Sequence, residues 1–155
     1  MQFLKSDPDL FRIFPVPSFR ILDQTGYHLY GIPCITGFHD LTVGRYDRVL
    51  QELEPVVQML SARYLQGAEV PYGDGELLAA IQPLLNLLNG KYLVVPKPIE
   101  LDLANYALRF ESDRFRLYEN PNVLPWFYLA PAAEVLKDGE QVLAPLGRAA
   151  CRERV

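Results

Sequence analysis

The segment from residue 77 to residue 96 constrains the fold of this chain more than any other. It opens with apolar residues at helical spacing, namely Leu77, Leu78, Ile81, Leu84, Leu85 and Leu88. Asn89-Gly90 follows and supplies the left-handed conformation that commonly ends a helix. The next run, Lys91 to Pro96, is mostly apolar and is bounded by Gly and Pro, as a buried strand is. A helix that leads through a tight turn into a buried strand predicts an α/β fold.

Other helix signals lie upstream of this segment. We expect Asp74 to cap the helix and Pro83 to bend or divide it, because proline removes a backbone hydrogen bond. An earlier helix, with Thr42 as its N-cap, is predicted from the spacing of Tyr46, Val49, Leu50 and Leu53. Pro55 should interrupt it, and a further helix should run from there to Leu65 before Gln66-Gly67 closes it.

Short strands are predicted on both sides of these helices. Residues 11–14 alternate and stop at Pro15, and residues 19–22 form a possible second extended piece. Two alternating runs, 106–110 and 115–117, flank a turn at 111–113 and predict an antiparallel hairpin. Three arginines should occupy its solvated face: Arg109, Arg114 and Arg116. The predicted fold class is therefore α/β (α+β), a small mixed sheet with helices packed on it.

The last third of the chain is predicted in less detail. Asn120-Pro121-Asn122 indicates a tight turn, and residues 126–129 indicate a further strand. Residues 133–136 are a weaker strand candidate. Beyond residue 138 the pattern fits either a second hairpin or a helix over 140–152, and we favour the helix. With no repeat and no linker, residues 1–155 are predicted to form a single domain.

Composition narrows the classes of function. The net charge is −4 and the basic residues are scattered singly, which argues against a nucleic-acid surface. No signal peptide is visible, and the longest apolar stretch, residues 77–88, is shorter than the ~20 residues that span a bilayer. Taken alone, these features predict a cytoplasmic protein. The prediction reverses if the chain is a loop delivered by membrane helices outside it.

No residue pattern predicts a catalytic, cofactor-binding or metal-binding site. His28, Cys34 and His39 lack the paired spacing of a zinc site. Cys34 with His39 or His28 is a possible thiolate pair, but the apolar neighbours of Cys34 disfavour a thiolate. Cys151 is a possible disulfide partner of Cys34, and spacing does not decide whether the two pair. The Gly73-Asp74-Gly75 turn places an acid where a phosphate would bind.

Two broader possibilities remain open. Four acids near aromatic residues are candidates for a raised pKa and for acid–base chemistry, namely Asp40, Asp47, Glu111 and Glu119. The seventeen Tyr and Phe residues are candidates for the lining of a groove that binds a sugar or a peptide. We favour surface charges for the acids and core positions for the aromatic residues.

Several short stretches, in this order, resemble the extracytoplasmic domain of YfhO-type bacterial membrane proteins, which are multi-spanning relatives of the GT-C glycosyltransferases. The stretches are Phe11-Arg12-Ile13, Tyr30-Gly31-Ile32, Thr36-Gly37-Phe38-His39-Asp40, Gly44-Arg45-Tyr46, residues 84–94, and residues 115–121 with Leu124-Pro125. The resemblance covers residues 11–130, without the membrane helices or the β-rich segment that usually follows. It implies a fragment of a larger membrane protein, outside the cytoplasm.

The resemblance also implies what the chain does. Members that glycosylate would use acids between membrane helices and a polyprenyl-phosphate sugar, so no catalytic residue carries over to this chain. The expected function is a non-catalytic domain that serves assembly or acceptor recognition in cell-envelope glycosylation. Its expected partners are the membrane helices of its parent and a glycan or lipid-linked acceptor. The alternative is a small cytoplasmic enzyme or ligand-binding domain that uses Cys34 and His39.

Overall fold

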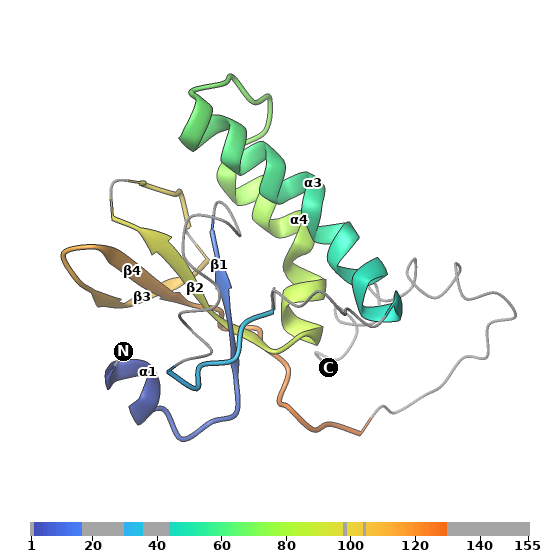
Figure 1. Ribbon diagram of the computed structural model, residues 1–155, viewed down its shortest axis with the longest axis vertical. Coiled ribbons are helices and arrows are strands. Elements are labelled where there is room, and N and C mark those ends of the chain that lie inside the picture. The colour runs from blue at the N-terminus through green and yellow to red at the C-terminus, as the bar shows by residue number, and fades with distance from the viewer. Residues whose placement is uncertain (1, 17–29, 36–43, 98, 104, 130–155) are drawn as a thin grey trace, which may run out of the picture.

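A four-stranded mixed sheet organises the molecule (Figure 1). The computed structural model describes residues 2–16, 30–35, 44–97, 99–103 and 105–129. The strands are β1 (Arg12–Pro15), β2 (Gly90–Pro96), β3 (Ala107–Glu111) and β4 (Phe115–Glu119), in the spatial order β1-β2-β4-β3. β1 runs parallel to β2, whereas β4 is antiparallel to both β2 and β3. The predicted fold class, a mixed sheet with an antiparallel hairpin and packed helices, is confirmed.

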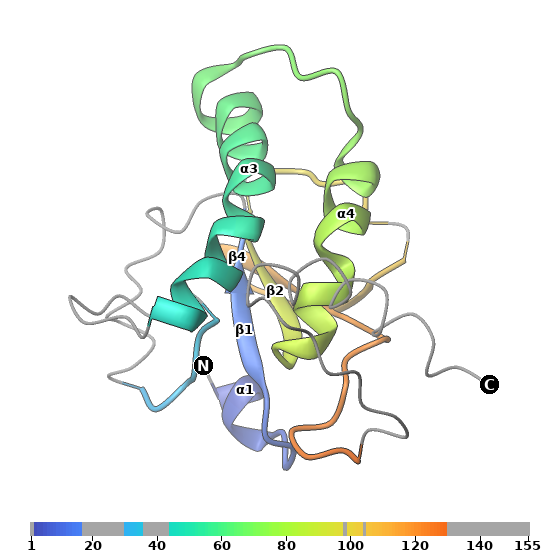
Figure 2. The same ribbon diagram turned by 90° about the vertical axis from the view of Figure 1, so that its right-hand side faces the viewer.

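Helices cover both faces of the sheet unequally. α3 (Gly44–Gln66) and α4 (Asp74–Leu87) lie side by side over one face, and the short α1 (Gln2–Ser6) lies near the other (Figures 1 and 2). Alternate residues of the strands point to the two sides, as the pleat requires. Phe14, Leu93 and Val95 join the core under α3 and α4, whereas Ile13, Tyr92 and Val94 join a second core on the α1 side.

The predicted passage from helix to strand is confirmed. α4 buries Leu78, Ile81 and Leu85 on the sheet, and Asn89 takes a positive φ of 58° before β2 begins at Gly90. A Cβ atom at Gly90 would lie 2.7 Å from Cδ1 of Ile35 and 3.1 Å from the carbonyl oxygen of Leu85. Only glycine therefore allows this close approach of strand and helix.

The predicted interruption of the earlier helix at Pro55 is wrong. α3 runs without interruption through Pro55, and α4 is not divided at Pro83. An internal proline costs about 3 kcal/mol. Pro55 is solvent-exposed, and its helix neighbours in the core outweigh that cost: Leu53, Val56, Val57 and Leu60 are all buried.

Two further expectations are corrected. Asp74 is the first residue of α4 rather than its N-cap; the cap is Gly73, whose N–H donates to Oε2 of Glu76 at 2.8 Å. Residues 126–129 do not form a strand, because they pair with none of the strands that the structure describes and their side chains are exposed. The hairpin is present as predicted, with Arg109 and Arg114 exposed and Arg116 half-buried.

The turn at Asn120-Pro121-Asn122 is also confirmed, with the N–H of Asn122 donating to Oδ1 of Asn120 at 3.0 Å. Other predictions lie outside the described residues. These are the extended piece at 19–22, Thr42 as an N-cap, the strand candidate at 133–136, and the helix or hairpin beyond residue 138.

Candidate functional site

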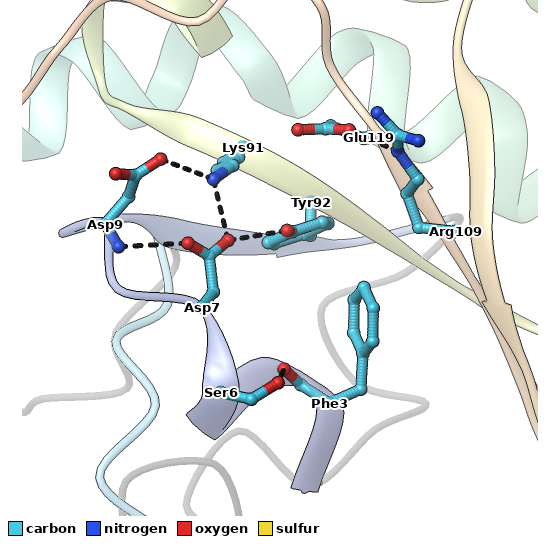
Figure 3. Close-up of polar contacts among 8 residues, drawn as sticks. All are labelled: Phe3, Ser6, Asp7, Asp9, Lys91, Tyr92, Arg109 and Glu119. Carbon is cyan, nitrogen blue, oxygen red and sulfur yellow. Dashed lines mark hydrogen bonds and ion pairs between the residues drawn. The ribbon is translucent and has the colours of Figure 1, made fainter.

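A cluster of charged side chains joins the N-terminal segment to the start of β2 (Figure 3). Nζ of Lys91 donates hydrogen bonds to Oδ2 of Asp7 and to Oδ2 of Asp9, each at 2.7 Å. The hydroxyl of Tyr92 donates to the same oxygen of Asp7 at 2.6 Å. We call these four residues, Asp7, Asp9, Lys91 and Tyr92, the N-terminal clasp. It links positions more than 80 residues apart in the sequence.

The clasp keeps its members in fixed charge states. Burial alone would disfavour the Lys91 ammonium, but its hydrogen bonds to Asp7 and Asp9 outweigh burial and raise the pKa of Lys91. Burial opposes the Asp7 carboxylate as well, and the bonds from Lys91 and Tyr92 overcome it and lower the pKa of Asp7. Burial and the bond to Asp7 both raise the pKa of Tyr92. At neutral pH the clasp is a carboxylate–ammonium pair closed by a phenol.

These charge states decide what the clasp can do. An amine nucleophile or general base needs a pKa lowered toward neutrality, which is the opposite of the shift at Lys91. Side chains of Lys91 and Asp7 are only 11% and 9% exposed, so little of either is open to a ligand. The clasp is therefore built to hold α1 and the turn after it against the sheet.

A second polar cluster is a network of amide side chains at the C-terminal part of α4. Nδ2 of Asn120 donates to Oδ1 of Asn86 at 2.9 Å and to the carbonyl oxygen of Gly90 at 3.1 Å. Nε2 of Gln82 donates to Asn86 and Asn120, and Oε1 of Gln82 accepts from the hydroxyl of Tyr106. Asn86 and Asn120 are buried. The network ties α4, β2 and the turn after β4 together, so these amides serve packing.

A third cluster surrounds Asp74 at the start of α4. Its carboxylate accepts hydrogen bonds from the guanidinium of Arg63 and the hydroxyl of Tyr64, both on α3. Burial, followed by the hydrogen bond to Asp74, raises the pKa of Tyr64 to about 12. Arg63 also donates to the carbonyl oxygen of Val70 at 3.0 Å. Asp74 thus joins the two helices and is not free to take a ligand.

Of the residues weighed as zinc ligands, a thiolate pair or a disulfide, the structure describes only Cys34. Cys34 is 6% exposed and lies within the α1-side core. His28, His39, Asp40 and Cys151 lie outside the described residues. Within the described part of the chain, no group of three or more His, Cys, Asp or Glu residues could hold a metal ion.

The other acids of interest are engaged in surface contacts. Glu111 interacts with Lys97 and Arg116, whose hydrogen bonds lower the pKa of Glu111. Glu119 accepts from Arg109 across the hairpin (Figure 3). Asp47 accepts from Nε2 of Gln51 one turn later at 2.9 Å. The lowered pKa of Glu111 is the opposite of what a proton donor near neutral pH would need.

The sequence predicts only part of the clasp. Lys91 and Tyr92 are predicted to begin a strand, without any partner for their polar groups. Asp7 and Asp9 carry no local signal, because two acids around Pro8 also suit an exposed turn. Only the pairing of β1 with β2 brings them to Lys91.

Comparisons with known proteins add no relative: no protein-family model matches the chain, and no curated protein or solved structure matches it significantly. None of the helices in the described residues is both long enough and apolar enough to cross a membrane.

Proposed function

We propose that this chain is a non-catalytic extracytoplasmic domain of a YfhO-type, GT-C glycosyltransferase-like membrane protein, and that it serves assembly or acceptor recognition in cell-envelope glycosylation. Its partners would be the membrane helices of its parent and a glycan or lipid-linked acceptor. Any transfer of a sugar from a polyprenyl-phosphate donor would take place on those other parts of the parent.

One observation carries the proposal: the residues that suggest the family hold parts of the fold together through hydrogen bonds. Lys91 and Tyr92 hold α1 through Asp7. Asn120 holds Gly90 and Asn86, and Asn89 donates to the carbonyl oxygen of Leu124 at 2.7 Å. Side chains that fix a fold would recur in order wherever the same domain is used, whether or not the parent is an enzyme.

Reading the coding sequence on both sides of this segment tests the proposal most cheaply. We expect stretches of about 18 or more apolar residues near it, the length that marks a membrane helix. Stop codons or polar linkers on both sides would exclude a membrane parent.

A second experiment tests the isolated chain for catalysis. The isolated chain should show no glycosyl transfer from a polyprenyl-phosphate sugar, and Cys34→Ala should change no activity found in it. Turnover that Cys34→Ala abolishes, in a variant with an unchanged circular dichroism spectrum, would favour the alternative enzyme.

A further inference from the structure

A run of four exposed apolar side chains follows the turn after β4. Trp126, Phe127, Tyr128 and Leu129 are 37%, 80%, 43% and 97% exposed. Isolated apolar residues are ordinary on a protein surface, but a run of three or four exposed ones is unexpected unless it has a function. We call these four residues the apolar tip.

The apolar tip belongs to one end of the molecule. The segment that carries it lies at the same end as α1 and the turn into β1, opposite the loop that joins α3 to α4 (Figures 1 and 2). The guanidinium of Arg12 at the start of β1 lies over the ring of Trp126, 4.4 Å from its centroid. The same turn carries Leu10, which is 63% exposed. Exposed apolar groups thus come from two separate segments.

The backbone around Trp126 is fixed rather than loose. The N–H of Leu124 donates to the carbonyl oxygen of Asn86 at 3.1 Å, and Leu124 accepts from Asn89. Arg12, which stacks on Trp126, itself donates to the carbonyl oxygen of Leu88 at 3.0 Å. The fold therefore presents the indole at a set position.

The chemistry of the tip suits the surface of a lipid bilayer. Trp and Tyr carry an apolar ring with a polar end and concentrate at the level of the lipid headgroups, and Phe and Leu favour the acyl region beneath. The irregular backbone of residues 126–129 offers no strand for a peptide to pair with. An insertion of headgroup depth leaves its polar backbone groups within reach of water, which a deeper position would not.

The charges of residues 2–12 and the neighbouring Lys91 are nearly balanced. Lys5, Arg12 and Lys91 are the cations, and Asp7 and Asp9 are the anions, with Lys91 bonded to both acids. Attraction to anionic lipid should therefore contribute little, and burial of apolar area should supply most of the affinity.

We propose that the apolar tip inserts into the headgroup region of a lipid bilayer and orients the domain with this end toward the membrane. The proposal rests on the proposed function, which sets the domain beside a membrane, and it names the surface that would face it.

Trp126 is the only tryptophan of the chain, so its fluorescence reports on this surface alone. The full chain is titrated with uncharged phosphatidylcholine vesicles. We expect a blue shift of the emission and co-sedimentation with the vesicles. Raising the salt to about 1 M, which screens charges beyond ~3 Å, should change the partition coefficient less than about twofold.

Substitutions then locate the contact. Phe127→Ser and Leu129→Ser should each lower the partition coefficient on the order of tenfold, the loss expected for one buried apolar side chain. Leu65→Ser is the matched control, because Leu65 is 50% exposed near the end of α3, away from the tip, and should leave binding unchanged. Circular dichroism confirms that each variant is folded.

Absence of a blue shift, or an equal loss in Leu65→Ser, would overturn the proposal. So would self-association in sedimentation velocity that Phe127→Ser abolishes without vesicles present, since the tip would then bind a second copy. These outcomes are separable from the proposed function: flanking membrane spans without vesicle binding leave that function standing, and vesicle binding without such spans leaves only the insertion.

Discussion

The two faces of the sheet are covered by helices of very different length. α3 and α4, with 23 and 14 residues, cover one face with a large, mainly aliphatic core. α1 has 5 residues and lies on the face where the clasp forms. A helix that short has no stability of its own in water. The long helices rest mainly on buried apolar area, with the Arg63–Asp74 pair between them, whereas the short helix depends on specific contacts.

Aromatic rings supply part of those contacts. Phe3 and Phe11 meet the ring of Tyr92 edge to face, with centroids 5.9 Å and 5.1 Å away. Phe3 also stacks on Phe110 of β3 at 5.6 Å. Such pairs add about 0.5–1.5 kcal/mol each beyond the burial of area. Tyr92 therefore joins the aromatic packing to the clasp, with its ring in one and its hydroxyl in the other.

The largest effect is expected on the helix-covered face. Leu85 of α4 is fully buried, and Leu85→Ala should lower the free energy of unfolding by about 3 kcal/mol through lost burial and the cavity left behind. Urea denaturation measures it. Leu65→Ala, at an exposed position of α3, is the control and should cost less than about 0.5 kcal/mol. A cost below about 1 kcal/mol for Leu85→Ala would mean that buried apolar area is not what holds α4 on the sheet.

An intermediate effect is expected at the clasp. Lys91→Met keeps the apolar stem but leaves the Asp7 carboxylate without its cation, which should cost about 2 kcal/mol. This is less than for a fully buried pair, because Asp9 is 68% exposed and α1 can separate locally. Hydrogen exchange should show the amides of α1 exchanging faster while those of α4 change little.

A double variant separates the two possible causes. In Lys91→Met with Asp7→Asn no unpaired charge remains, so part of the lost stability should return. If the double variant is no more stable than the single one, the loss reflects packing of the lysine stem, and the clasp does not act through charge.

A smaller effect is expected from acid. The pKa of Asp7 is lowered from 3.8 in the folded protein, so its contribution is fully present above the unfolded value and is lost as pH falls through the folded value. α1 should therefore loosen below about pH 4, before the helix-covered face does. Exchange of the α1 amides against pH measures this. Asp7→Asn should flatten that dependence; an unchanged profile would assign it to another carboxylate.

Local pattern was sufficient to predict the helix-covered face. The apolar stripe of α4, the turn at Asn89-Gly90 and the strand after it are all decided by neighbours in sequence. The hairpin of β3 and β4 was predicted for the same reason. The sequence misled the prediction at Pro55 because the cost of a proline inside a helix is local. The burial that outweighs this cost depends on contacts across the fold.

The clasp and the place of Asp74 depend on contacts that no local pattern shows. Asp74 looked like a cap because it precedes a helix, yet its partners Arg63 and Tyr64 lie on another helix. Residues 126–129 looked like a strand because aromatic residues favour strands, but strand propensity has no effect without a neighbour to pair with.

The smallest expected effect tests whether the clasp stabilises the fold because it is buried, rather than because it is charged. Arg109 pairs with Glu119 across β3 and β4 (Figure 3). The Arg109 side chain is 54% exposed, against 11% for Lys91. Water already solvates such a pair and ordering two long side chains offsets its attraction, so Arg109→Gln should cost no more than about 0.5 kcal/mol. Urea denaturation in low and high salt measures the loss of stability beside that of Lys91→Met.

If Arg109→Gln costs as much as Lys91→Met, then ion pairs stabilise this sheet wherever they lie, and the α1 face does not differ from the hairpin. A near-zero cost at Arg109 with a large one at Lys91 would show that the clasp acts because it is shielded from water.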